Sequence, residues 1–123
     1  MGERRLFALR GAAQCLNSEE DIQKQVLKTY DELLLRNNLE EKEIVSVFFS
    51  VTGDLDVENP ATALRKGGRA LETALFVSQE AQFQGNFERI LRILIHCYLD
   101  SSQTPVHVYR NGAELLRPDR IQL

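Results

Sequence analysis

The fold of this chain is decided by residues 89–99, which have the sequence Arg-Ile-Leu-Arg-Ile-Leu-Ile-His-Cys-Tyr-Leu. Periodicity alone permits a strand or a helix, and a helix would place Ile90, Leu94 and Cys97 on one stripe. We predict a strand, because both faces of the segment are apolar, as in the buried central strand of a sheet. Arg92 then lies on the same face as Ile90 and Leu94.

Arg92 is the residue of this segment that most needs a partner. A guanidinium is always ionised, and placing it among apolar side chains costs free energy unless an anion meets it. Either the protein supplies that anion, or a ligand does.

The remaining elements follow from periodicity, caps and turn residues. Further strands are expected over residues 4–12, 44–52, 73–78 and 106–109. Helices are expected from a cap at Asn17 or Ser18 as far as Asn37-Asn38, over 61–66, and as one turn over 113–116. The order β-α-β-α-β-β-β predicts an α+β fold in which a mixed sheet has helices on one face. The uncovered apolar face then needs a partner, and self-association is the simplest one.

Composition limits the class of protein. A chain of 123 residues with 43% hydrophobic content predicts a single globular domain over 1–123. The net charge of −3 argues against a general nucleic-acid binder. No apolar run approaches a membrane span, and the N-terminal apolar stretch is too short for a signal peptide. Cys15 and Cys97 form no metal-ligand spacing or disulfide framework, so we expect reduced thiols and a cytoplasmic protein.

The familiar catalytic motifs are absent from the sequence. It contains no glycine-rich phosphate loop, zinc-ligand spacing or nucleophile elbow, so we expect no metal and no cofactor. We expect His96 to be a core residue and His107 to be a strand residue beside a loop.

Arginines near turns and strand ends stand out instead, at Arg10, Arg65, Arg92 and Arg117. Converging on one pocket, they would bind a dicarboxylate through bidentate contacts. The alternative is that they are ordinary surface or ion-paired side chains. That alternative is strongest for Arg65, on a short exposed helix, and weakest for Arg10 and Arg92, which have apolar neighbours.

Several short motifs occur in a fixed order along the chain. They are Leu9-Arg10-Gly11-Ala12, Thr52-Gly53-Asp54-Leu55, Pro60-Ala61 followed by Arg65, Gln79-Glu80 with Arg92 twelve positions after Glu80, His107-Val108-Tyr109, and Leu116-Arg117-Pro118-Asp119. In this order, and covering nearly the whole chain, they resemble the trimeric α/β-barrel class of chorismate mutase, the monofunctional bacterial type.

That resemblance implies a ferredoxin-like, chorismate-mutase-like sheet with helices on one side, assembled as a homotrimeric pseudo-α/β-barrel with active sites between subunits. It implies the conversion of chorismate to prephenate in phenylalanine and tyrosine biosynthesis. This intramolecular Claisen rearrangement needs neither a cofactor nor a covalent intermediate. It also implies a flexible C-terminal tail, which we place at 118–123.

The resemblance also assigns the site residues. Arg92 would donate to the ether oxygen of the substrate, Glu80 would accept from its ring hydroxyl, and Arg10 would hold a carboxylate. Substrate-binding positions would be Tyr109, Arg65, Arg117, Ala61, Val77, Phe76, Asn59, Thr62 and Leu116. The chain departs from the family's usual residues at three of these positions, namely Asn59, Thr62 and Val77.

Two alternatives share this architecture. One is a trimeric imine deaminase of the YjgF type, which binds small carboxylates with an interfacial arginine. The other is a non-catalytic trimer that senses a carboxylate of the aromatic pathway. The combination of Glu80, Arg92 and the Leu-Arg-Pro-Asp motif favours the mutase.

Overall fold

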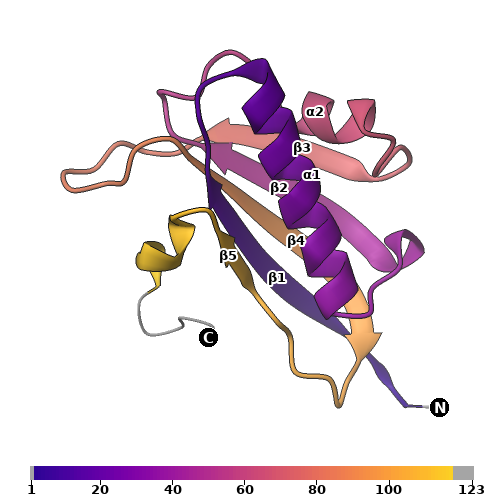
Figure 1. Cartoon of the computed structure of the whole chain (residues 1–123). Coiled ribbons are helices and arrows are strands. Elements are labelled where there is room, and N and C mark those ends of the chain that lie inside the picture. Colours follow the sequence, from indigo (N-terminus) through magenta and orange to yellow (C-terminus); the bar gives the residue numbers. More distant parts are fainter. Residues whose placement is uncertain (1, 118–123) are drawn as a thin grey trace.

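The computed structural model describes residues 2–117, and the expected tail at 118–123 lies outside the described residues. A twisted sheet carries two α-helices on one of its faces (Figure 1). The strands are β1 (Arg4–Gln14), β2 (Ile44–Val51), β3 (Ala74–Gln79), β4 (Ile90–Asp100) and β5 (Val108–Arg110). The helices are α1 (Glu19–Arg36) and α2 (Pro60–Lys66), with short 3-10 turns η1 (Glu41–Glu43) and η2 (Ala113–Leu116). This confirms the predicted order of elements and the mixed α+β architecture.

The strands lie in the order β3-β2-β4-β1-β5. β4 is antiparallel to both of its neighbours, β1 and β2, whereas β3 pairs in parallel with β2 and β5 in parallel with β1. β4 therefore occupies the middle of a mixed sheet, with hydrogen-bonded partners on both sides. The predicted strand over 89–99 is confirmed, and the helical alternative is wrong.

The two faces of the sheet differ sharply. Alternate β4 residues Leu91, Ile93 and Ile95 are buried beneath the helices, whereas Arg92 and Leu94 between them are only partly buried. The same alternation runs along β1 and β2, so one face forms the core with α1 and α2. We call the other face, which carries Arg92, the open face (Figure 1).

Local sequence signals set the ends of α1. Ser18 caps its N-terminus by accepting a hydrogen bond from the Asp21 amide at 3.1 Å. Its C-terminus is capped by Asn37, and Asn38 takes the left-handed conformation with φ of 49°. Ile22, Val26, Tyr30 and Leu33 recur at helical spacing and lie on the buried stripe of this helix.

Gly11 allows α1 to approach the sheet closely. A Cβ atom at this position would lie 2.7 Å from Leu33 Cδ1 and 3.0 Å from Thr29 Cγ2, which is closer than real Cβ contacts. β1 also continues past this glycine to Gln14, where the sequence had predicted its end near Gly11-Ala12. The strand continues because β4 pairs with it as far as Gln14 and β5 pairs with its other edge.

The last strand is shorter than expected and begins later. We predicted residues 106–109, and the structure has Val108–Arg110. The side chain of Asn37 takes both the backbone N–H and the backbone C=O of Val106, at 2.8 and 2.9 Å, so these groups do not join the sheet. The 3-10 turn over Ala113–Leu116 confirms the predicted helical turn.

The short helix α2 is held to α1 through Glu58. The Glu58 carboxylate accepts hydrogen bonds from Gln23 on α1 at 2.9 Å and from Lys66 at the end of α2 at 3.2 Å. It also accepts from the Asn59 amide at 3.0 Å, while the Asn59 side chain caps α2 by accepting from the Ala61 amide at 2.8 Å. Hydrogen bonds, chiefly that from Gln23, lower the pKa of Glu58.

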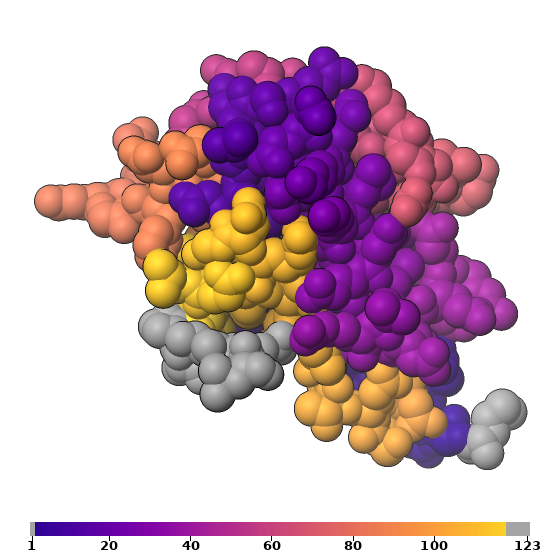
Figure 2. All heavy atoms as spheres, viewed as in Figure 1, coloured from indigo at the N-terminus to yellow at the C-terminus, as the bar shows by residue number. Residues whose placement is uncertain are grey.

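The connection between β3 and β4 projects from the body of the protein (Figure 2). This loop extends from Glu80 to the start of β4. Phe83 and Phe87 in this loop are exposed.

The central position of β4 gives a stability prediction. Ile95 is fully buried, so we expect Ile95→Ala to lower the free energy of unfolding by about 2–5 kcal/mol. Leu35→Ala is the matched control, because Leu35 is 82% exposed and should change that free energy by less than about 0.5 kcal/mol. Urea denaturation followed by circular dichroism measures both, and equal effects of the two variants would contradict the assignment of the core.

Glu58 gives a prediction for the pH dependence of stability. Because its pKa is lowered in the folded state, its contribution is present above the pKa of the unfolded chain and is lost as the pH falls through the folded value. Glu58→Gln should therefore destabilise the protein at pH 7, and the difference from the wild type should shrink in acid. Glu72→Gln is the control, since Glu72 is exposed. A difference that stays constant from pH 7 to pH 3 would contradict the role of Glu58.

Candidate active site

A pocket of about 310 Å³ lies on the open face of the sheet. All five strands contribute to it, together with Arg117 after η2. It is lined by Arg10, Gly11, Ala12, Phe48, Phe49, Ser50, Ser78, Arg92, Ile93, Leu94, Tyr109 and Arg117. Four of the residues predicted from the sequence therefore meet here, namely Arg10, Arg92, Tyr109 and Arg117.

Strand register creates the space around Arg92. The residue pairs with Ala12 of β1 on one side and with Ser50 of β2 on the other. Both neighbours have small side chains, so the long Arg92 side chain has room above the sheet. Directly opposite residues in a sheet are the closest side-chain neighbours, and larger residues here would fill the pocket.

Glu80 reaches Arg92 across β2, from the end of the neighbouring strand β3. It follows β3 directly, and its amide donates a hydrogen bond to the Val51 carbonyl at 2.7 Å. Its carboxylate Oε1 forms an ion pair with Arg92 Nε. The Glu80 side chain is 17% exposed and that of Arg92 is 43% exposed.

The geometry of this ion pair leaves donors for a ligand. Among the described residues Glu80 is the recorded partner of Arg92, and the bond uses Nε. The two terminal nitrogens of the guanidinium are thus available, and the pocket is where they can meet a ligand. The carboxylate both compensates the charge of Arg92 and fixes the direction of its side chain.

Arg10 and Tyr109 stand on neighbouring strands. The Arg10 amide donates to Nδ1 of His107 at 3.0 Å, which ties β1 to the residue just before β5. Tyr109 pairs with Ala12, so it shares the open face with Arg10. His107 lies in the loop just before β5, so the expectation that it is a strand residue is wrong.

A small second cluster of apolar side chains supports the C-terminal edge of the pocket. Its buried members are Ala12, Ile90 and Ala113, and Tyr109 and Leu116 pack against them. Leu116 therefore packs against this cluster beside the pocket and is not one of the pocket's lining residues. This packing seats η2 and leads the chain to Arg117.

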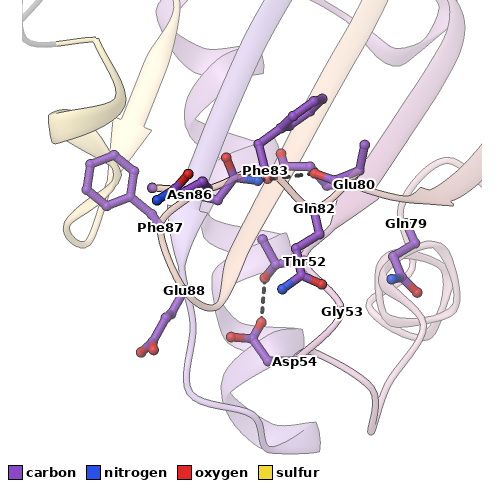
Figure 3. Close-up of a pocket in the computed structure, with 13 residues that line it drawn as sticks. Thr52, Gly53, Asp54, Gln79, Glu80, Gln82, Phe83, Asn86, Phe87 and Glu88 are labelled. Atoms are coloured by element: carbon purple, nitrogen blue, oxygen red, sulfur yellow. Dashed lines mark hydrogen bonds between the residues drawn. The ribbon is translucent and has the colours of Figure 1, made fainter.

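The charge of the pocket distinguishes it from a larger hollow nearby. That hollow, of about 670 Å³, lies beneath the β3–β4 loop (Figure 3). Its lining includes Asp54, Glu80 and Glu88 with several amides, but no arginine or lysine. Among residues 2–117, the smaller pocket is lined by three arginines and no carboxylate, which suits it to an anionic ligand.

The other predicted site residues do not line this pocket within one chain. Those on or beside α2 are Asn59, Ala61, Thr62 and Arg65, and those on β3 are Phe76 and Val77. Asn59 caps α2, Ala61 is buried, and Thr62 and Arg65 are exposed. Phe76 lies on the open face with its ring 5.9 Å from that of Phe48, and Val77 packs on the core.

Phe48, Ser50 and Ser78 are among the lining residues that were not identified from the sequence. Alternation along a strand over 44–52 is enough to place Phe48 and Ser50 on one face. The missing information was the pairing of Ser50 with Arg92 and with Ser78, which depends on long-range register.

The two cysteines and His96 are not arranged to act as a catalytic nucleophile. Burial raises the pKa of Cys15 to about 12 and that of Cys97 to about 11, so both thiols stay protonated at neutral pH. His96 lies on the open face, not in the core as expected, with Nδ1 3.3 Å from Ser46 Oγ. Among residues 2–117, no group of three or more His, Cys, Asp or Glu side chains is arranged to hold a metal ion.

These features suit a reaction controlled by shape and charge. The pocket can orient a compact dicarboxylate through its arginines and present a fixed cation to charge that develops inside it. Its described lining residues include no nucleophile and general base held together by a hydrogen bond, which acyl transfer would need.

Comparisons with known proteins agree with this chemistry. The family profile "Chorismate mutase type I" matches residues 6–120. Chorismate mutase AroH of Thermus thermophilus is 33% identical over 117 residues, which cover 90% of this chain and 95% of that protein. The solved chorismate mutase from Clostridium thermocellum superposes with a TM-score of 0.81 at 34% identity, covering 89% of this chain and 98% of that one.

These matches favour the first hypothesis over the imine deaminase and the sensor. Within residues 2–117, none of the helices has the length and hydropathy needed to span a bilayer. The motifs, the mixed sheet and the arginine-lined pocket all agree with the profile match. The chain therefore belongs to the type I chorismate mutase family.

Proposed function

We propose that this protein converts chorismate to prephenate, one step in the biosynthesis of phenylalanine and tyrosine, with the whole chain acting as one catalytic domain. The observation that carries the proposal is the pocket in which Arg92, fixed by Glu80, lies beside Arg10 and Tyr109. The family match over residues 6–120 supports it. The reaction breaks the ether C–O bond while a C–C bond forms within the same molecule, so it requires neither a nucleophile nor a cofactor.

Arg92 would supply the main electrostatic contribution. As the C–O bond breaks, negative charge accumulates on the ether oxygen, and a terminal nitrogen of Arg92 would donate a hydrogen bond to it. Such a donor stabilises the transition state more than the ground state, and so accelerates the reaction. The ion pair with Glu80 holds the guanidinium in place before the substrate arrives.

The other lining groups would restrain the substrate. Arg10 would bind a carboxylate and orient the enolpyruvyl group, and Tyr109 would donate a hydrogen bond to a carboxylate. Arg117 would add positive charge at the mouth of the pocket, and Glu80 would accept from the ring hydroxyl. Holding the flexible dianion in its compact reactive shape lowers the entropic part of the barrier.

We further propose that the protein is a homotrimer whose sites are completed by a neighbouring subunit. Asn59, Ala61, Thr62 and Arg65 would come from that neighbour, with Phe76, Val77 and Leu116 at the margin of the site. Apolar side chains left exposed on the open face support association through it: Leu6, Phe48, Phe76 and Tyr98.

The departures from the family's usual residues have structural counterparts here. Asn59, where phenylalanine is usual, caps α2 through its side chain, so the helix start is stabilised while apolar wall is lost. Val77 packs on the core, so only its backbone is available to the substrate. We expect these changes to affect efficiency rather than the reaction. The free thiols of Cys15 and Cys97 support a cytoplasmic location, in a reducing compartment.

The direct test is to follow the absorbance of chorismate with purified protein. We expect the wild type to consume chorismate and yield prephenate, and Arg92→Ala to lower kcat by about a hundred- to a thousandfold, the typical cost of removing a preorganised donor at developing charge. Arg36→Ala is the matched control, because Arg36 lies at the end of α1 on the other side of the sheet.

The outcomes of this assay separate the hypotheses. A protein that binds chorismate without consuming it would be a sensor, and one that ignores chorismate but releases ammonia from imino acids would be a deaminase. Turnover in Arg92→Ala equal to that of the wild type would remove Arg92 from its proposed role.

The assembly has a separate test by light scattering. We expect a particle with three times the 14.0 kDa mass of one chain. Leu6→Glu places a charge on the open face outside the pocket, and should shift the protein toward smaller species at equal concentration. Leu35→Glu, at an exposed position of α1, should leave the mass unchanged. A wild-type monomer would contradict a site shared between subunits.

A further inference from the structure

Arg110 is an arginine that points away from the pocket. It is the last residue of β5, and its side chain is only 19% exposed. Its Nη1 donates to Gln25 Oε1 at 2.9 Å and to Thr29 Oγ1 at 3.3 Å, and its Nε lies 3.8 Å from Glu32 Oε1. All three partners belong to α1, so one side chain joins the edge strand to the helix layer.

The partners on α1 are unusual for the buried stripe of a helix. Gln25 is 5% exposed and Thr29 is fully buried, although their neighbours on the stripe are apolar. The Gln25 amide nitrogen donates to Asp21 at 3.2 Å, so its oxygen faces Arg110. Buried polar groups left without a partner are costly, which explains why α1 carries these residues opposite Arg110.

β5 is a short strand at the edge of the sheet, where the buried Val108 and the hydrogen bond from the Arg10 amide to His107 also help to hold it. It has three residues, pairs only with β1, and is the last strand in the order. Figure 2 shows this C-terminal segment lying against α1. A three-residue edge strand makes few backbone hydrogen bonds, so side-chain contacts decide where it sits.

Alternation along β5 connects this contact to the pocket. Arg110 pairs with Ala13 on the helix face, and the preceding Tyr109 pairs with Ala12 on the open face. Fixing Arg110 against α1 therefore fixes the direction of Tyr109 on the opposite face. The chain then continues through η2 to Arg117, so both C-terminal lining residues depend on the position of β5.

We infer that Arg110 is a positioning residue, which holds β5 against α1 so that Tyr109 and Arg117 are placed for substrate capture. This inference rests on the proposed function for its kinetic consequence. Tyr109 and Arg117 would bind groups that are charged before and during the reaction, so displacing them weakens ground-state and transition-state binding alike. Such a loss raises KM and leaves kcat nearly unchanged.

The test compares Arg110→Met with Lys28→Met. The first removes the donors of Arg110 and keeps an unbranched apolar stem, and the second removes a positive charge from an exposed position of α1 beside Thr29. We expect KM for chorismate to rise by about tenfold in Arg110→Met, with kcat within about threefold of the wild type. Lys28→Met should match the wild type, and Arg110→Lys, which keeps the charge without the planar fork, should fall between.

A second measurement does not depend on activity. Hydrogen exchange of the folded protein, read by mass spectrometry, should become faster in residues 106–117 of Arg110→Met and remain unchanged elsewhere. Gln25→Met removes the hydrogen bond between Gln25 and Arg110 from the helix side. If Arg110→Met does not fold, KM and hydrogen exchange are measured on Gln25→Met instead.

An unchanged KM would overturn the inference, whether the exchange stays at wild-type rates or the whole protein loses stability. A wild type that leaves chorismate intact would contradict the proposed function instead, and the exchange comparison would then decide on Arg110 alone.

Discussion

The site depends on one interaction, the ion pair between Arg92 and Glu80 on the open face of the sheet. A guanidinium on a central strand needs an anion, and Glu80 supplies it from across β2, on which the residue paired with Arg92 is the small Ser50. The pair engages Nε of the guanidinium and leaves its other nitrogens directed at a pocket. The protein therefore supplies an anion itself, and the remaining nitrogens of Arg92 could donate to a ligand.

The remaining architecture can be understood as support for that pair. The helix face of the sheet is apolar and is covered by α1 and α2, so the core is built on one side only. The open face is left to arginines, small residues and exposed apolar side chains. β5 contributes side chains to both faces of the sheet. Tyr109 lies on the open face, and Arg110 binds polar residues of α1 on the helix face. By this inference, the proposed substrate-binding groups are positioned by contacts made on the opposite face of the same sheet.

The sequence predicted the elements well because their signals are local. Ser18, Asn38 and Asn59 act at the ends of helices, and strand alternation separates the two faces. The sequence did not predict where the last strand begins. Asn37, which is distant in sequence, accepts a hydrogen bond from the Val106 amide and sets that position. Nor did the sequence identify Ser50 and Ser78 as lining residues, because the pairing of distant strands is not encoded in any one segment. The placement of Arg10, Arg92, Tyr109 and Arg117 in one pocket followed from family motifs rather than from periodicity.

The most direct measurement is a crystal structure of the protein with an oxygen-bridged bicyclic diacid that mimics the compact reactive shape of chorismate. The account predicts that a terminal nitrogen of Arg92 lies within hydrogen-bonding distance of the bridging ether oxygen, while Nε stays paired with Glu80. A mimic bound with its ether oxygen away from Arg92, or an Arg92 side chain turned wholly toward protein carboxylates, would contradict it.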